Sequence, residues 1–428
     1  MLPRLLVASA ALLLVVLAAL AVLVLLRDEV AAGDGPIAAI TLGEAELVER
    51  GAYLATAGNC ASCHTTAGGA YMAGGLAFET PFGIIHSTNI TPDVETGIGA
   101  WSERDFLNSM RHGVRPDGEH LYPVFPYTAF TKVTNEDVAA LFAYLQSVPP
   151  VRQSAPENDL PFPFRIRALM AFWKALFFEP GAFEADRAQA ADWNRGAYLV
   201  EALAHCSACH SPRNLMGAEQ TRLAMSGGVF VDHVTPEARR PWSAPNLTAS
   251  ERGLGLWSRD DLAAYLQEAR NPFLESFGPM NEVIMNSTRH LDGADVDAMA
   301  VYLKSLPAID AGPVEAPEQL VMGRGRTIYN LHCGICHLPT GEGDPEMAPK
   351  LNRGSLVVQD ENPASLINVI LYGPHPPQPP LPQKWRTPME EFRYKLDDEE
   401  VAAVASFVRH SWGNAAGLVT PEQVAGQR

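Results

Sequence analysis

The chain has 428 residues, of which 47% are hydrophobic, so it is long enough for roughly two to four ordinary domains with hydrophobic cores. Its 32 basic and 49 acidic side chains give a formal net charge of -17. This charge argues against binding to nucleic acid and against attraction to anionic lipid.

The first element is an uninterrupted apolar run over residues 5–26, which follows a single basic residue. Its 22 residues exceed the apolar core of a cleaved signal peptide and suffice for a helix across a bilayer. We therefore expect residues 1–27 to form a transmembrane signal anchor in the bacterial cytoplasmic (inner) membrane. The positive charge before the run places the rest of the chain on the periplasmic side. The alternative is a signal peptide cleaved near Ala31 or Ala32.

A short cysteine–histidine string, C-x-x-C-H, follows in three places and contains all 6 cysteines, so none is left for a disulfide. On one helical turn the two thiols and the imidazole share a face. The thiols can then attach one porphyrin while the imidazole ligates its iron, which is the pattern of c-type haem attachment. A redox dithiol or half of a zinc site is the alternative for a single C-x-x-C, and the threefold repetition disfavours both. The predicted attachment and ligand residues of three covalent haem c groups are Cys60, Cys63 and His64; Cys206, Cys209 and His210; and Cys333, Cys336 and His337.

Longer stretches recur around these strings, which indicates internal repeats. The stretch "RGAYL" begins at Arg50 and at Arg195, and a looser "GRTIY" begins at Gly325. Downstream, "NITPDVETGIGAWSERDF" from Asn89 matches "NLTASERGLGLWSRDDL" from Asn246. Each repeat is predicted to have a leading helix, a haem string, a middle of turns and short helices, and a closing amphipathic helix.

No strand-like alternation recurs, and proline-rich connectors begin at Pro149 and Pro307. The predicted fold is therefore all-α, with three tandem haem domains after an N-terminal transmembrane helix. The predicted segments are 1–27 (signal anchor), 43–150 (first haem domain), 151–189 (linker with an amphipathic helix), 190–307 (second haem domain), 318–413 (third haem domain) and 414–428 (C-terminal tail).

The linker contains "RALMAFWKALFFEP" from Arg167, which is rich in aromatic residues on a helical period. An apolar stripe of this kind more often packs against a core than docks a partner. We expect a packed helix, with a docking face as the alternative.

The sixth ligand of each iron is expected in the loop before the closing helix, where a methionine would complete histidine–methionine coordination. In the third repeat Met389 has this position, behind a proline-rich lead-in, and Met347 is a rival. In the second repeat Met280 and Met285 are both suitably placed. The first repeat has Phe125 at the corresponding place, and phenylalanine cannot ligate iron.

From about Glu44 to Asn414 the chain resembles the three-haem cytochrome c subunits of bacterial membrane-bound alcohol, aldehyde and gluconate dehydrogenases. The resemblance rests on the three haem strings in order together with "RGAYL", "TPFG" before "STNITPD", "GIGAWS", "HCSACHSPRN", "GPM" and a final "SWGN". It implies cytochrome c-like domains, and it selects Met280 over Met285 because the family's methionine follows Gly-Pro. Many relatives have methionine where this chain has Phe125.

The resemblance also implies an electron relay in a hetero-oligomer. A separate dehydrogenase catalytic subunit, with a quinone, flavin or molybdenum cofactor, would pass electrons through the haems to ubiquinone or a terminal oxidase. The chain itself is expected to have no catalytic residues.

The ligand of the first haem stays open between His120, His86, Met110, Met72 and a five-coordinate iron. If the first iron has an open coordination position, a second functional hypothesis remains: a self-contained multihaem enzyme that acts on a small molecule such as peroxide.

Overall fold

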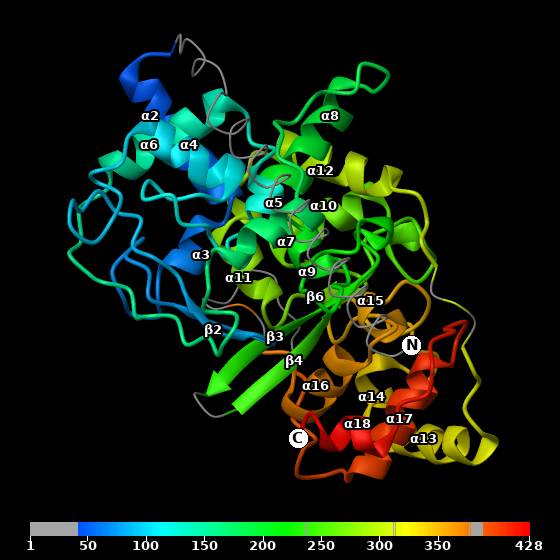
Figure 1. The fold of residues 1–428 in the computed structure, drawn as a ribbon. Coiled ribbons are helices and arrows are strands. Elements are labelled where there is room, and N and C mark those ends of the chain that lie inside the picture. Colours follow the sequence, from blue (N-terminus) through cyan, green and yellow to red (C-terminus); the bar gives the residue numbers. More distant parts are fainter. Residues whose placement is uncertain (1–41, 236–237, 311, 313, 376, 378–387) are drawn as a thin grey trace, which may run out of the picture. The chain divides into compact units, whose positions relative to one another are not determined.

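The computed structural model describes residues 42–235, 238–310, 312, 314–375, 377 and 388–428. The chain forms two compact units, which divide between Glu184 and Ala185 (Figure 1). The predicted second and third haem domains both lie in the second unit. The division falls inside the predicted linker 151–189, and the finer domain boundaries stay predictions.

The N-terminal unit, up to Glu184, is built on helices with one small hairpin. Its elements are α2 (Glu44–Ala57), α3 (Cys60–His64), β1 (Ala77–Thr80), β2 (Gly83–His86), α4 (Glu103–His112), α5 (Tyr127–Phe130), α6 (Asn135–Ser147) and α7 (Leu169–Phe177).

The C-terminal unit, from Ala185, contains the second and third repeats. Its second-repeat elements are α8 (Ala191–Tyr198), which continues into the π-helical turn η1 (Leu199–Leu203), α9 (Ser207–His210), β3 (Gly228–Thr235), β4 (Ala238–Ala244), α10 (Arg259–Glu268), β5 (Arg270–Asn271), β6 (Leu274–Glu275), α11 (Met280–Asn286) and α12 (Gly293–Ser305). Its third-repeat elements are α13 (Gln319–His332), α14 (Gly334–His337), α15 (Leu356–Gln359), α16 (Ala364–Tyr372), α17 (Asp398–Arg409) and α18 (Pro421–Ala425). Short 3₁₀ turns at Thr221–Leu223, Leu254–Leu256 and Thr288–His290 also belong to this unit.

In each repeat the leading helix crosses the closing helix at a glycine. A Cβ on Gly51 of α2 would stand 1.9 Å from the carbonyl oxygen of Ala140 in α6. A Cβ on Gly196 of α8 would stand at the same distance from the carbonyl oxygen of Ala298 in α12. Only a residue without a side chain allows backbones to approach so closely, which explains the glycine of the repeated "RGAYL".

The same crossings are fastened by ion pairs from the arginine before that glycine. The Arg50 guanidinium contacts the buried Asp137 carboxylate, with Nε to Oδ1 at 2.6 Å. Arg195 makes a two-pronged pair with Asp295, with distances of 2.8 and 2.6 Å. Such bidentate geometry fixes the angle between the two helices as well as attracting them.

The prediction of an all-α fold is wrong, because the described residues contain three two-stranded antiparallel sheets. Strand β1 pairs with β2 from Ala77↔His86 to Thr80↔Gly83, and β3 pairs with β4 from Gly228↔Ala244 to Thr235↔Ala238. The third pair, β5 and β6, has two residues in each strand. These hairpins lie in the predicted turn-rich middles of the repeats, where strands this short give little periodic signal.

The predicted transmembrane helix over residues 5–26 lies outside the described residues. Within the part of the chain that the structure describes, no helix is both long and apolar enough to cross a membrane.

Polar contacts join the second and third repeats within the C-terminal unit. The buried Trp257 ring stacks on Phe273, with centroids 5.8 Å apart, and its indole N–H donates to the carbonyl oxygen of Gly354 at 2.7 Å. The Ser365 hydroxyl donates to the carbonyl oxygen of Ser243 at 2.9 Å. The two repeats of this unit therefore share a hydrogen-bonded contact.

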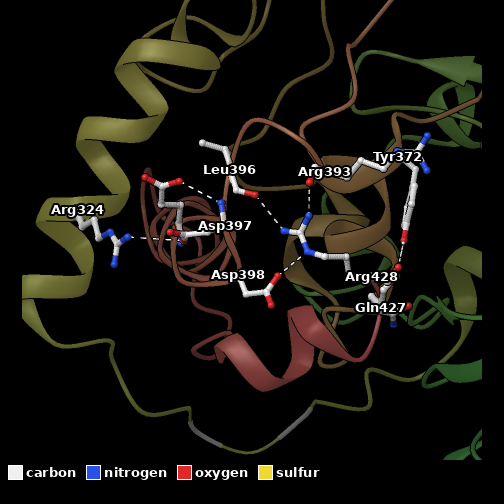
Figure 2. A network of polar contacts seen from close by, with 9 residues as sticks. Arg324, Tyr372, Arg393, Leu396, Asp397, Asp398, Gln427 and Arg428 are labelled. Atoms are coloured by element: carbon white, nitrogen blue, oxygen red, sulfur yellow. Dashed lines mark hydrogen bonds and ion pairs between the residues drawn. The ribbon is translucent and has the colours of Figure 1, made fainter.

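The C-terminal segment packs against the third repeat (Figure 2). The Arg428 guanidinium contacts the Asp398 carboxylate at 2.6 Å and donates to the carbonyl oxygen of Leu396 at 3.0 Å. The Tyr372 hydroxyl donates to the carbonyl oxygen of Gln427 at 2.8 Å. The segment predicted as a tail is thus held at both the start of α17 and the end of α16.

The aromatic segment of the linker forms α7, and part of it packs as expected. Trp173 is buried, and its ring meets Tyr127 edge-on at 6.4 Å. Leu176, on the same helix, is 59% exposed. The packed interpretation is confirmed for Trp173.

Candidate haem sites

All three C-x-x-C-H strings form a single helical turn at the end of a leading helix. The first is α3, whose entry is a left-handed residue, Asn59, with φ of 51°. The string in the second repeat starts eleven residues after Arg195, whereas the first starts ten after Arg50. The π-helical turn η1 just before the second string provides the wider turn that accommodates one additional residue.

The six cysteines, all within the described residues, form no disulfide and are half-buried. Burial is the main cause that raises the pKa of the first thiol of each string, Cys60, Cys206 and Cys333, to about 12. Reactive dithiols have lowered pKa values instead. In addition, the described residues contain no group of three or more His, Cys, Asp or Glu side chains placed to hold a metal ion. The raised pKa values of the three thiols disfavour the redox-dithiol alternative.

The imidazole of each string is anchored through one ring nitrogen. Nδ1 of His64 lies 2.7 Å from the carbonyl oxygen of Thr88, and Nδ1 of His210 lies 2.7 Å from that of Pro245. Nδ1 of His337 lies 2.9 Å from the carbonyl oxygen of Pro349. Because a carbonyl only accepts, each Nδ1 carries the proton and donates.

This anchoring leaves Nε2 as the nitrogen with a lone pair. Burial lowers the pKa of His64, His210 and His337, so the imidazoles are neutral. A neutral imidazole that donates from Nδ1 to a backbone carbonyl is the usual state of a metal-ligating histidine. The residues therefore fit a haem iron at each Nε2.

The accepting carbonyls were not found by sequence reasoning, because a backbone acceptor has no side-chain signature. The signal was present in the repeat, since Thr88 and Pro245 directly precede the matched Asn89 and Asn246. Each asparagine fixes the turn that follows. The Asn89 carboxamide oxygen accepts from the N–H of Thr91 at 2.9 Å, and that of Asn246 accepts in the same way from the second residue after it, at 2.8 Å.

In the first two repeats, a β-hairpin directly precedes the carbonyl that accepts from Nδ1. The acceptor lies 24 residues after His64 and 35 residues after His210, and a hairpin fills each interval. In the third repeat the interval is 12 residues and contains one isolated antiparallel bridge, between Asp344 and Ala348. The strands that contradict the all-α prediction therefore position the proximal side of the first two candidate sites.

In the second repeat the contacts distinguish the two methionines. Met280 begins α11, half-buried, directly after Gly278 and Pro279. The sulfur of Met285 instead accepts from the guanidinium of Arg289 at 3.1 Å. The geometry favours Met280, which stays a prediction as the sixth ligand.

In the third repeat Met389 is half-buried, and most of the proline-rich lead-in lies outside the described residues. Its rival Met347 is two residues before Pro349, whose carbonyl accepts from Nδ1 of His337. The backbone of Met347 therefore lies near the Nδ1 acceptor. Met389 stays the predicted sixth ligand.

Comparison with known proteins identifies the class of fold first. A cytochrome c family model matches residues 48–149 and 322–412, so the chain contains cytochrome c domains, whose cofactor is covalent haem c. The matched segments lie in the first and third repeats, and the count of three haems stays a prediction.

Individual relatives then give the family. The chain is 39% identical to the gluconate 2-dehydrogenase cytochrome c subunit of Pantoea cypripedii, over 89% of each chain. It is 37% identical to the alcohol dehydrogenase (quinone) cytochrome c subunit of Gluconacetobacter polyoxogenes, over 89% of this chain and 84% of the relative. It is 42% identical to a nicotinate dehydrogenase subunit of Pseudomonas putida over 86% of this chain, which spans 30% of that relative. The chain belongs to the family of dehydrogenase cytochrome c subunits, as the motifs predicted.

Proposed function

We propose that this chain is the electron-relay subunit of a dehydrogenase complex and that it carries three covalent haem c groups. The observation that supports this most directly is the threefold geometry of the strings: two cysteines on one turn, followed by an imidazole anchored through Nδ1.

A covalently held haem supplies one-electron redox chemistry at a fixed position. The cysteines would tether each group, and the carbonyls of Thr88, Pro245 and Pro349 hold the imidazoles in the ligating tautomer. Met280 and Met389 would be the sixth ligands in the second and third repeats, where a thioether raises the reduction potential.

The substrate is decided by another chain. Relatives of similar identity are named for gluconate, alcohol and nicotinate dehydrogenases. Sequence related to this chain thus occurs in proteins named for different substrates. We propose a catalytic subunit as electron donor, ubiquinone or a terminal oxidase as acceptor, and a location on the periplasmic side of the bacterial cytoplasmic membrane.

Haem counting of the purified full chain tests the cofactor assignment. We expect about three haems per chain by the pyridine haemochrome method, and about two when both cysteines of one string are replaced. The matched control is Ser62→Ala, which changes a residue between Cys60 and Cys63 and should leave three. A wild-type count below three, or no loss in the double cysteine variant, contradicts the proposal.

Electron transfer is tested with the intact complex. Substrate should reduce the haems within turnover time, and a ubiquinone analogue or the host's terminal oxidase should reoxidise them. Haems that stay oxidised while the catalytic subunit is reduced would rule out the relay.

A further inference from the structure

The first repeat can be aligned with the second through matching hydrogen bonds. Helices α4 and α10 both end at a left-handed residue, Gly113 with φ of 62° and Ala269 with φ of 59°. The carbonyl oxygen of Gly113 accepts from the N–H of Leu121 at 2.7 Å, and that of Ala269 accepts from the N–H of Ser276 at 2.7 Å. Leu121 and Ser276 are therefore equivalent positions.

Phe125 and Met280 each lie four residues after these equivalent positions, so Phe125 occupies the place of the candidate ligand Met280. The Phe125 ring lies 5.4 Å from the ring of Phe130. A Cβ on Gly58 would stand 3.8 Å from Phe130 and 3.5 Å from Sγ of Cys60. Phe130 therefore lies between Phe125 and the start of the first haem string.

The backbone of two other candidate ligands, His86 and Met72, lies close to the carbonyl that accepts from Nδ1 of His64. The carbonyl of Thr88 marks the Nδ1 side, opposite to the iron-ligating Nε2. His86 is two residues before Thr88. The carbonyl oxygen of Met72 accepts from the N–H of Ile90 at 3.0 Å, and Ile90 is two residues after Thr88. The backbone of both candidates is therefore near the Nδ1 acceptor, which favours neither as a ligand opposite to Nε2.

Met110 is a core residue by the same alignment. It lies eight residues after Ser102, the N-cap of α4, and Leu266 lies eight residues after Ser258, the N-cap of α10. Met110 and Leu266 are 5% and 6% exposed. A position that leucine fills in one repeat is a packing position and supplies no ligand.

His120 has no lone pair for iron. The ammonium of Lys174 lies 3.0 Å from its Nδ1 and also donates to the carbonyl oxygens of His112 and Gly113, each at 2.7 Å. A cation that only donates makes Nδ1 the acceptor, so the proton of the neutral imidazole is on Nε2. Both ring nitrogens are thus engaged or protonated.

We propose that the haem of the first repeat has no protein side chain as its sixth ligand, and that Phe125 leaves this position open to a small neutral diatomic molecule such as carbon monoxide. The inference rests on the proposed attachment of a haem to Cys60 and Cys63. Binding forms one bond to the iron and requires no oxidant or reductant beyond reduction of the protein.

The test is a carbon monoxide titration of the dithionite-reduced full chain, with the haem count measured on the same sample. We expect about one carbon monoxide per chain carrying three haems. Phe125→Met should supply a thioether ligand and abolish most of the binding, and it should add one methionine–iron charge-transfer band in the oxidised protein. Met280→Phe is the matched opposite and should raise the stoichiometry to about two.

Three haems without carbon monoxide binding would overturn this inference and leave the relay intact. If His120→Ala or His86→Ala then creates binding, that histidine is the ligand. Binding that persists unchanged in Phe125→Met would also overturn the inference, because another position would then control the site. A haem count below three would instead contradict the proposed cofactor assignment.

Discussion

At the residue scale the candidate haem sites were predicted from side chains, and the ligand roles of these side chains stay predictions. The cysteines and histidines of the three strings were identified from spacing alone, and the structure places each set on one helical turn. The carbonyl acceptors of Thr88, Pro245 and Pro349 were not, because every residue has a carbonyl. Single glycines also belong to this scale, because the atoms that an added Cβ would meet show whether a glycine is required at a helix crossing.

Two glycines two residues apart in α13 give a matched pair for testing the helix crossing of the third repeat. A Cβ on Gly325 would stand 2.2 Å from the carbonyl oxygen of Ala403 and 2.6 Å from Cβ of Phe407. We expect Gly325→Ala to lower the free energy of unfolding by about 3 kcal/mol, because the two backbones must separate. Urea unfolding of the haem-loaded protein measures this.

The control is Gly323→Ala, where a Cβ would meet nothing within 4 Å. Alanine is the better helix former, so this variant should be unchanged or stabilised by up to about 1 kcal/mol. Equal destabilisation by both substitutions would show that the close crossing is not the cause.

At the scale of elements, helices were predicted and strands were missed. The helix starts followed capping signals: Ser102 accepts from the N–H of Asp105 at the start of α4, and Asp397 accepts from that of Glu400 at the start of α17. The hairpins follow from pairing between segments of two to eight residues, which no local period reveals. In the first repeat, the turn after the hairpin depends on one buried side chain, that of Asn89.

Replacing Asn89 should loosen the turn that holds the proximal carbonyl. The Asn89 carboxamide donates to the carbonyl oxygen of Val151 at 2.7 Å and accepts from the N–H of Thr91 at 2.9 Å, while 3% exposed. Asn89→Ala leaves these buried groups without partners, so we expect a loss of about 1–3 kcal/mol in the free energy of unfolding. Chemical denaturation followed by circular dichroism measures it.

Glu95→Ala, in the same loop, is the control. Glu95 pairs with Arg152 where both side chains are more than half exposed, so the change should be within about 0.5 kcal/mol. If Asn89→Ala is as mild as this control, the turn does not depend on the buried carboxamide.

At the scale of the whole molecule, the repeats were evident from the sequence, and the grouping into two units was not. Matching stretches such as "RGAYL" marked three repeats, whereas the contact between the second and third depends on individual pairs such as Trp257 with Gly354. In the sequence, Trp257 is one aromatic residue of a repeated motif. Its buried hydrogen bond joins it to a residue 97 positions further on, which no local pattern predicts.

Trp257→Phe should weaken that contact while keeping an aromatic ring against Phe273. The carbonyl oxygen of Gly354 loses its donor, so we expect the unfolding free energy of the C-terminal unit to fall by about 1–2 kcal/mol. In calorimetry of the full chain, the substitution should lower the unfolding temperature of the C-terminal unit and leave that of the N-terminal unit unchanged. Trp193→Phe is the control, because its indole N–H bonds the Ser305 hydroxyl at an exposed site and the loss should be small.

The unequal intervals between each proximal histidine and its carbonyl, 24, 35 and 12 residues, have a consequence for how such chains diversify. Only the final carbonyl must reach the imidazole, so the segment between can lengthen or shorten while the hydrogen bond to Nδ1 is kept. These intervals are natural graft points. In the second repeat the segment also contains β4, whose Ser243 accepts from Ser365 of the third repeat, so an exchange there must keep that contact.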